Sequence, residues 1–169
     1  MPLSTPPPGL AVRHDLRPGD VGRIVERHGT LYARECGFDV TFEAYVAGPL
    51  ARFALERAER ERLWIAERAD DGRFAGCIAM VATASPAEAQ LRWFLVEPDT
   101  RGTGLGRWLL AEALAFARES GYETVRLWTV NGLLAAAHLY RAAGFVKVEE
   151  KPGAWGAPVM EEMYRLRIS

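Results

Sequence analysis

The sequence has only two cysteines, Cys36 and Cys77, which lie far apart and show no CxxC spacing. This scarcity argues against a disulfide framework, and we expect both residues to be free thiols in a reducing compartment. The histidines at positions 14, 28 and 138 show no metal-ligand spacing with the cysteines. We therefore predict a protein without a structural metal.

Long apolar runs are also missing, since nothing in the chain approaches the length of a transmembrane helix. The N-terminal segment MPLSTPPPGLA lacks the basic start and apolar run of a signal peptide. We therefore expect a cytoplasmic protein. Because proline cannot join a helix and disfavours ladder pairing, residues 1–10 are predicted to form a flexible, proline-rich tail.

Neither sign of charge is in excess. Lys and Arg total 21 and Asp and Glu total 22, for a net charge of −1 at pH 7. Without a broad basic field, nucleic-acid binding is not expected to be the main task, and no membrane partner is expected. The 169 residues, of which 49% are hydrophobic and 25% charged, suit one globular domain, expected over residues 11–169.

What the chain does contain is a succession of short helix and strand signals. One helix is predicted from Asp20, as its N-cap, to Gly37, and a second from about Thr41 to Arg62 with a break or bend at Pro49. Strands are predicted at 11–16, 63–68, 74–83, 90–96, 125–129, 145–150 and 160–168, and further helices at 105–120 and 133–142. This order indicates an α/β (α+β) fold, with a mixed sheet and helices on both faces.

The segment RWFLVEPDTRGTGLGR, residues 92–107, carries the clearest chemical signal. A buried strand runs into a turn, three glycines alternate with other residues, and a helix begins. Glycine lets the backbone approach a ligand closely, and the first turn of a helix offers N–H groups and a positive dipole end to an anion such as pyrophosphate. Arg101 and Arg107 bracket this loop and could add positive charge.

Two other phosphate-binding loops do not fit this segment. A P-loop needs GxxxxGK followed by Ser or Thr, and the dinucleotide fingerprint needs GxGxxG, whereas this loop reads Gly102-x-Gly104-x-Gly106. On spacing alone, a tight strand-to-helix turn without a ligand stays an alternative. A protein–protein scaffold is disfavoured, because a scaffold does not require alternating glycines beside an arginine.

The run Arg101-x-x-Gly104-x-Gly106, after a strand that ends Val96-x-Pro98, resembles the acyl-CoA signature of the GNAT acyltransferase superfamily. The resemblance implies a mostly antiparallel central sheet in which strand 92–96 carries a bulge and splays away from the strand at 125–129. The pantetheine arm of coenzyme A would then fill the gap like a short extra strand.

A second motif follows at the family spacing, on the helix after the next strand: Leu139-Tyr140, then Gly144-Phe145. The resemblance extends over about residues 12–168 and is closest to the acetyltransferase domain that often follows a MarR-type winged-helix repressor domain. The proline-rich tail is too short to be such a repressor domain.

The resemblance implies acetyl-CoA as acetyl donor and co-substrate, with no metal. The implied cofactor-binding residues on the strand end and the loop are Phe94, Leu95, Val96, Arg101, Gly102, Thr103, Gly104, Leu105, Gly106 and Arg107. Family members commonly place a cofactor-binding asparagine seven residues before the tyrosine, where this chain has Leu133. The nearest asparagine, Asn131, is a candidate cofactor ligand, with a plain Asn131-Gly132 turn as the alternative.

The implied reaction is direct attack of a neutral amine on the thioester. By its family position, Tyr140 is the candidate acid that protonates the departing thiolate, and it also contacts the cofactor; an ordinary packing role is the alternative. A backbone N–H near Leu95 would stabilise the oxyanion.

A proton acceptor is also needed, because most alkylamines are protonated at pH 7. Glu43 is the candidate base, since Phe42 and Tyr45 could bury its carboxylate and raise its pKa. Glu97, His28 and a water relay with no single base stay open as alternatives.

The acceptor is expected to be a primary amine of a small molecule or a lysine side chain, and a homodimer is possible without direct sequence evidence. Candidate walls of the acceptor pocket are His28, Tyr32, Phe38, Trp93 and Trp155. A noncatalytic acyl-CoA-binding regulatory module is the alternative function, since the nearest relatives are often fused to repressors.

Overall fold

The computed structural model describes residues 5–169. Residues 1–4 of the predicted tail lie outside the described residues. The rest of the tail leads into the first strand, where the backbone N–H of Ala69 donates to the carbonyl oxygen of Gly9 at 2.9 Å.

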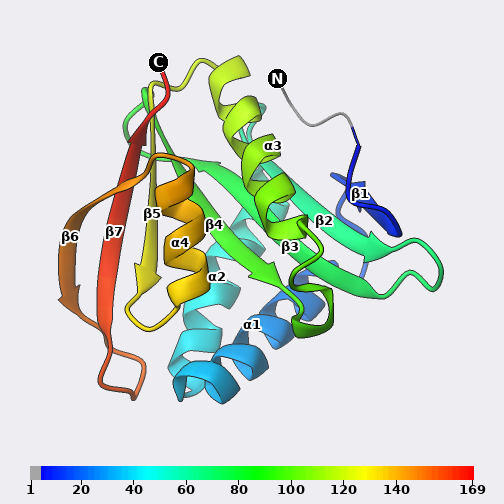
Figure 1. Cartoon of the computed structure of the whole chain (residues 1–169), viewed down its shortest axis with the longest axis horizontal. Helices are drawn as coiled ribbons and strands as arrows, with labels where there is room; N and C mark the ends of the chain where they lie inside the picture. Colours follow the sequence, from blue (N-terminus) through cyan, green and yellow to red (C-terminus); the bar gives the residue numbers. More distant parts are fainter. Residues whose placement is uncertain (1–4) are drawn as a thin grey trace. The chain divides into compact units, whose positions relative to one another are not determined.

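Within residues 5–169, seven strands and four α-helices follow one another, with one short 3-10 helix (Figure 1). The elements are β1 (Leu10–Arg13), α1 (Asp20–Cys36), α2 (Val40–Glu56), β2 (Arg62–Arg68), β3 (Phe74–Ala82), β4 (Glu88–Val96), η1 (Pro98–Thr100), α3 (Leu105–Glu119), β5 (Thr124–Val130), α4 (Leu134–Ala142), β6 (Val146–Pro152) and β7 (Met160–Arg167).

The strands form one sheet in the order β1-β2-β3-β4-β5-β7-β6. The ladders from β1 to β4 are antiparallel, and β4 pairs with β5 in parallel. Contacts of Asn131 with Met160 and of Glu123 with Ile168 are those expected of an antiparallel β5–β7 pair. The predicted mixed, mostly antiparallel sheet is confirmed.

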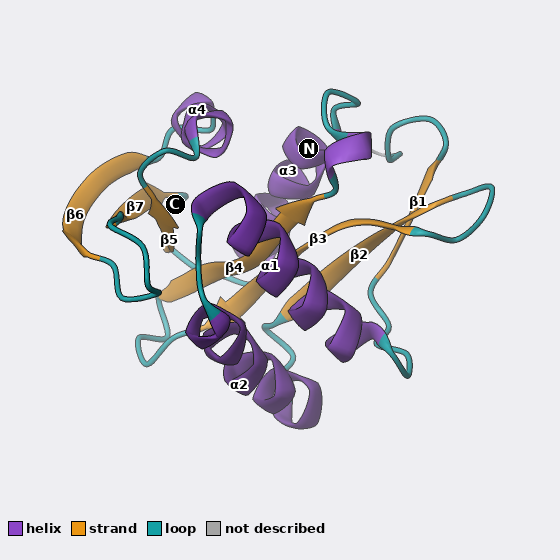
Figure 2. Ribbon diagram, turned by 90° about the horizontal axis from the view of Figure 1, so that it is seen from below, coloured by secondary structure: helices purple, strands orange, loops and turns teal. Residues whose placement is uncertain are grey.

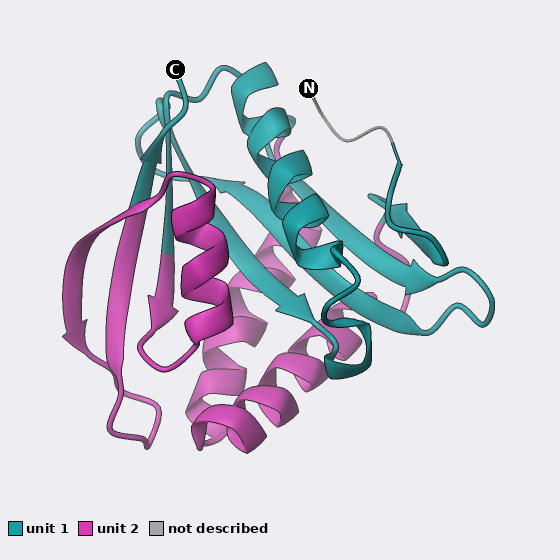
Figure 3. Ribbon diagram, viewed as in Figure 1, with its two compact units in different colours: residues 1–15, 59–127, 165–169 teal, residues 16–58, 128–164 magenta. Residues whose placement is uncertain are grey.

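The chain divides into two compact units (Figure 3). Unit 1 comprises residues 1–15, 59–127 and 165–169, and unit 2 comprises residues 16–58 and 128–164. In unit 1, the strand β3 is buried over most of its length, and α3 packs against β3 and β4 through residues such as Leu109 and Ala113, which are fully buried.

In unit 2, β6 is exposed along its whole length, and the helices lie on either side of β7. Helix α4 lies on one side of this strand, and α1 and α2 lie on the other (Figure 2). The helices α1 and α2 pack against each other, and α2 turns its apolar side inward through Phe42, Val46, Leu50 and Phe53. This arrangement leaves distinct helices on the two faces of β7.

Two helix predictions need correction. Of the predicted break or bend at Pro49, the break does not occur, since α2 continues through that residue, and the helix ends at Glu56 rather than near Arg62, where β2 begins instead. Asp20 is the first helical residue and Gly19 the N-cap, while the Asp20 carboxylate accepts the backbone N–H of Arg17 at 2.7 Å. Both bounds depend on how the helices pack in the folded protein, which the local sequence pattern does not contain.

Within residues 5–169, no helix combines the length and apolar character needed to cross a membrane. Both cysteines are free thiols, with Cys77 buried and Cys36 half-buried.

Candidate active site

A β-bulge interrupts β4 opposite the middle of β3. Cys77 pairs with Leu95 and Ala79 pairs with Arg92, so β3 advances two residues while β4 advances three. Trp93, which lies between Arg92 and Leu95, has a φ of 47°, in the left-handed region that residues other than glycine seldom adopt. The extra residue therefore lies at Trp93 and its neighbour, and the predicted bulged strand is confirmed.

The parallel pairing of β4 with β5 is short. In the part of the chain that the structure describes, its pairs run from Glu88 with Thr124 to Gln90 with Arg126. Strand β4 then continues to Val96 along β3 alone. The edge of β4 that follows the ladder is where an extended ligand can add as a strand.

Gly76 lets the bulged strand lie close to β3. A Cβ at this position would be 2.6 Å from the carbonyl oxygen of Leu95 and 3.4 Å from the side chain of Leu105. Any side chain here would collide with the Leu95 carbonyl group of β4, while its approach to Leu105 would be an ordinary contact. The absence of one therefore allows β3 and β4 to approach closely at this position.

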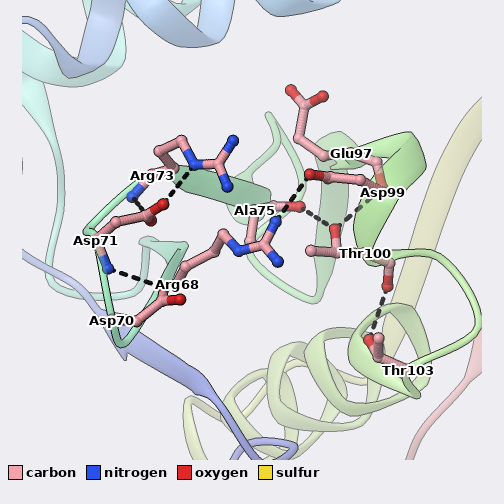
Figure 4. Close-up of polar contacts among 9 residues, drawn as sticks. All are labelled: Arg68, Asp70, Asp71, Arg73, Ala75, Glu97, Asp99, Thr100 and Thr103. Carbon is pink, nitrogen blue, oxygen red and sulfur yellow. Dashed lines mark hydrogen bonds and ion pairs between the residues drawn. The ribbon is translucent and has the colours of Figure 1, made fainter.

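Polar contacts within unit 1 fix the turn that follows β4 (Figure 4). The Thr100 hydroxyl donates to the carbonyl oxygen of Ala75 at 2.9 Å and to that of Glu97 at 3.0 Å. The Thr103 hydroxyl donates to the carbonyl oxygen of Thr100 at 2.7 Å. Two threonines thus anchor the start of the glycine loop to the end of β4.

The glycine loop itself is exposed and leads directly into α3. Gly102 and Gly104 have φ angles of 79° and 89°, and a Cβ added to either meets nothing within 4 Å. Gly104 is the N-cap of α3, so no side chain caps the first-turn N–H groups of that helix. The loop therefore borders open space and fits an anion such as the coenzyme A pyrophosphate.

The two arginines of the loop differ in their contacts. Both Arg101 and Arg107 are exposed. The Nε of Arg101 donates to the carbonyl oxygen of Val96 at 3.3 Å, which holds its guanidinium beside the end of β4. Either side chain can supply positive charge to the loop.

Tyr140 lies in α4, within unit 2, and is buried. Its ring contacts those of Phe145 and Tyr164, with centroids 5.9 Å and 6.1 Å apart. Burial raises the pKa of its hydroxyl, and the neighbouring Tyr32 of α1 raises that pKa further. The hydroxyl therefore keeps its proton throughout the neutral range.

Asn131 follows β5 and ties it to β7. Its side-chain oxygen accepts the backbone N–H of Met160 at 2.7 Å, and its own backbone N–H donates to the Met160 carbonyl oxygen at 2.9 Å. The side-chain oxygen is thus used within the protein. A contact of Asn131 with the cofactor stays a prediction.

The candidate bases in unit 2 lie at the contact between α1 and α2. A Cβ added at Gly29 would be 3.0 Å from the carboxyl carbon of Glu43, so this glutamate packs directly on α1. His28 is buried, and its Nδ1 lies 2.8 Å from the carbonyl oxygen of Ile24. This contact fixes the His28 ring, and His28 directly precedes Gly29, the residue of α1 on which Glu43 packs.

An aromatic cluster in unit 2 brings together most of the predicted acceptor walls. The Trp155 ring lies 5.2 Å from that of Phe38, 5.1 Å from Phe42 and 5.2 Å from Tyr45, between centroids. Tyr32 lies 4.7 Å from Phe42 and stacks on His28. Trp93, by contrast, belongs to unit 1 at the bulge.

The loop between α1 and α2 is tied to the loop between β6 and β7, because the backbone N–H of Asp39 donates to the carbonyl oxygen of Trp155 at 3.0 Å. Gly156 leaves room for this contact, since a Cβ there would be 2.5 Å from the Asp39 carboxylate. Phe42 and Tyr45 join the cluster although the sequence predicted them only as neighbours of Glu43. Phe42 and Tyr45 are three residues apart, a spacing that places both on one face of α2, and this spacing could have predicted that they cluster.

A bulged strand that feeds a glycine loop at a helix N-terminus defines an anion-binding fold suited to an extended nucleotide cofactor. Residues 25–145 match the model of the acetyltransferase (GNAT) family. The chain belongs to this family and, as expected, is an acetyl-CoA-dependent N-acetyltransferase.

Individual relatives agree with this assignment. An uncharacterized N-acetyltransferase of Schizosaccharomyces pombe is 28% identical over 121 residues, 70% of this chain and 72% of that protein. A mycothiol acetyltransferase of Cellulomonas flavigena is 46% identical over 52 residues, which are 31% of this chain and 15% of that protein. The structure of a Salmonella typhimurium protein with its cofactor acetyl-CoA has the same fold, with a TM-score of 0.73, 17% identity and 95% of both chains covered.

Proposed function

We propose that this chain transfers the acetyl group of acetyl-CoA to a primary amine of a small molecule by direct attack of the amine on the thioester. The observation that carries this proposal is the bulge at Trp93 in β4, the strand that leads into the glycine loop. A lysine side chain is the other acceptor that the proposal allows.

The co-substrate is proposed to lie along the end of β4 with its pyrophosphate on the loop. Supporting this, the loop is exposed, its glycines border open space, and the first turn of α3 has no side-chain cap. The proposed contacts are Phe94, Leu95, Val96, Arg101, Gly102, Thr103, Gly104, Leu105, Gly106, Arg107, Asn131 and Tyr140.

Tyr140 is proposed to protonate the sulfur when the C–S bond breaks. Its raised pKa keeps the hydroxyl protonated at neutral pH, so a proton is available for the leaving thiolate. The backbone N–H near Leu95 is proposed to donate to the carbonyl oxygen as negative charge develops there.

Glu43 is proposed to accept the proton that the attacking nitrogen loses. One proton leaves the amine and one reaches the sulfur, and exchange with solvent restores Glu43 and Tyr140 to their starting states. Glu43 lies at the α1–α2 contact, on the same helix as Phe42 and Tyr45 of the aromatic cluster. A small organic amine that presents apolar surface suits such walls.

Three finer expectations also stay proposals: a particular likeness to the acetyltransferase domain of MarR fusions, a cytoplasmic location and a homodimer. The mycothiol acetyltransferase relative supports a small-molecule acceptor for at least one similar protein.

The proposal is tested by release of free coenzyme A thiol from acetyl-CoA across a broad panel of primary amines, with mass spectrometry of the products. Amine-dependent release and an N-acetylated product are expected. Thiol release at background with every amine, together with normal coenzyme A binding, would favour the noncatalytic regulatory module instead.

A further inference from the structure

Asp99 is the only acidic residue in the segment that contains the glycine loop. Positions 98–111 hold no other Asp or Glu, while Arg101 and Arg107 are positive. Gly102 follows Asp99 by three residues, so their Cα atoms are at most about 11 Å apart. At this separation the carboxylate opposes the binding of a diphosphate, because charges in about 0.01 M salt act on one another over roughly 30 Å.

Hydrogen bonds within unit 1 fix the backbone that carries Asp99. The next residue, Thr100, donates its backbone N–H to the carbonyl oxygen of Glu97 at 2.9 Å and its hydroxyl to that of Ala75 at 2.9 Å. The backbone N–H of Glu97 also donates to the Ala75 carbonyl oxygen, at 2.9 Å. These contacts hold η1 against the start of β3, so the Asp99 carboxylate stays close to the loop.

Arg68, the last residue of β2, forms an ion pair with Asp99 (Figure 4). Its Nη1 donates to Oδ2 of Asp99 at 2.9 Å, and the two side chains are 31% and 59% exposed. The other arginine near the β2–β3 turn, Arg73, is directed to a different carboxylate, with its Nε 2.6 Å from Oδ2 of Asp71. Arg68 thus places its positive charge directly on the carboxylate of the loop segment.

The backbone around Arg68 is also held by hydrogen bonds. Its N–H donates to the carbonyl oxygen of Arg73 at 2.8 Å, and its carbonyl oxygen accepts the N–H of Gly72 at 2.9 Å. The N–H of the next residue, Ala69, donates to the carbonyl oxygen of Gly9 at 2.9 Å. The ion pair therefore joins two segments whose backbones are already fixed.

We propose that Arg68 is a positioning residue for coenzyme A: it neutralises Asp99 beside the glycine loop, so that this carboxylate does not repel the diphosphate. Arg68 acts through Asp99 and does not itself contact the cofactor. An exposed ion pair contributes little to the stability of a fold, so the effect of this pair should appear in cofactor affinity. The inference rests on the placement of the pyrophosphate in the proposed function.

The test is isothermal calorimetry of coenzyme A binding to the full chain. Arg68→Gln should raise the Kd for coenzyme A by about three- to tenfold at an ionic strength of about 0.01 M, and by less than about twofold at about 1 M, where the Debye length is near 3 Å. At the lower ionic strength, Asp99→Asn should bind coenzyme A at least as tightly as wild type. The double variant Arg68→Gln, Asp99→Asn should bind within about twofold of wild type, because it removes both charges of the pair.

Arg118→Gln is the matched control, because it removes the same charge from an exposed position in the last turn of α3. This position lies about 20 Å along the helix from Gly104. The Kd of this variant should stay within about twofold of wild type at both ionic strengths.

Three results would overturn the inference. A double variant as weak as Arg68→Gln would show that Arg68 contacts the cofactor itself. A loss in Arg68→Gln that is equal at both ionic strengths would show that its role is not electrostatic. Equal Kd values for Arg68→Gln and Arg118→Gln would show that the pair with Asp99 does not matter.

Failure of the proposed function gives a different result. Coenzyme A binding needs no acceptor, so absence of amine acetylation would leave this test intact. Gly104→Ala, titrated alongside, checks the placement of the pyrophosphate. A loss of affinity in Gly104→Ala but not in Arg68→Gln would overturn the inference alone, and a loss in neither variant would overturn the placement as well.

Discussion

The thiol of Cys77 donates a hydrogen bond to the carbonyl oxygen of Trp93, with 3.1 Å between Sγ and O. The donor is on β3, and the acceptor is the residue of β4 that adopts the left-handed conformation. Burial, followed by the charge of Glu97, raises the pKa of the thiol, so it stays protonated and remains a donor. The bond thus satisfies a carbonyl group that the bulge removes from the regular ladder.

Cys77→Val should destabilise the fold by about 1–3 kcal/mol, because it keeps the approximate volume but leaves the Trp93 carbonyl without this donor. Cys77→Ser retains a donor and should lose less. Urea unfolding measures the difference, and Cys36→Ser serves as the control for loss of a cysteine. A Cys77→Val protein as stable as wild type would show that the hydrogen bond contributes nothing.

Gly76→Ala should lower stability by about 1–3 kcal/mol, since the added methyl group lies 2.6 Å from the carbonyl oxygen of Leu95 and the backbone must shift. The shift should also weaken coenzyme A binding, because the displaced segment leads into the glycine loop. Thermal unfolding and calorimetry with coenzyme A report the two effects. Unchanged values for both would mean that β3 and β4 have more freedom than this contact suggests.

Gly104→Ala should weaken coenzyme A binding by tenfold or more, on the order of 1–2 kcal/mol, because alanine disfavours the φ of 89° and adds a methyl group to the anion-binding loop. Gly121→Ala is the matched control, with a φ of 77° at the other end of α3 and equally open space around its Cβ. Both variants should lose similar stability, but only Gly104→Ala should lose affinity. Equal affinities in isothermal calorimetry would move the pyrophosphate away from Gly104.

Tyr140→Phe should lower kcat by roughly 10²-fold while the KM for acetyl-CoA stays within about twofold, because the phenol acts only on the departing sulfur. Since burial raises the pKa of Tyr140, its ionisation should not cause a fall in rate at mildly alkaline pH. Steady-state kinetics between pH 6 and 9.5 test both statements. Turnover equal to wild type would leave Tyr140 as a packing residue.

The free energy of unfolding should fall as the pH rises above about 9. The pKa values of Cys77 and Tyr140 are raised in the folded state, so the unfolded chain loses these protons first, and the slope from each group approaches about 1.4 kcal/mol per pH unit once the pH exceeds its unfolded pKa. Urea unfolding at pH 7, 9 and 10 should show the decline. A Cys77→Ser, Tyr140→Phe double variant should show a shallower one, and an identical slope would assign the decline to other groups.

Much of the fold follows from local pattern. The glycines at positions 37, 104 and 121 adopt positive φ at helix ends, where the sequence predicted helices to begin or end. The family spacing from the glycine loop to Tyr140 also predicted both as parts of the candidate site. These features depend on short stretches of chain, which is why sequence could locate them.

The rest depends on packing between distant segments. Proline inside a helix costs about 3 kcal/mol, yet α2 continues through Pro49, because burial of side chains such as Leu50 and Phe53 contributes about 1.5–3 kcal/mol each. Glu161 looks like an ordinary exposed acid on a strand near the end of the chain. The residue is only 9% exposed, because β7 lies between β5 and β6 in the sheet.

The extra residue at Trp93 shifts the alternation of β4 by one position. In a regular strand, the edge to which an N–H or C=O points is decided by whether the residue number is odd or even. The inserted residue reverses this odd-even rule from the bulge onward, so Arg92 and Leu95, three residues apart, occupy equivalent places in the ladder opposite Ala79 and Cys77. Removing a single amino acid from this position would make the ladder regular and abolish the bulge while the downstream pairs kept their register, an effect that no side-chain replacement could reproduce.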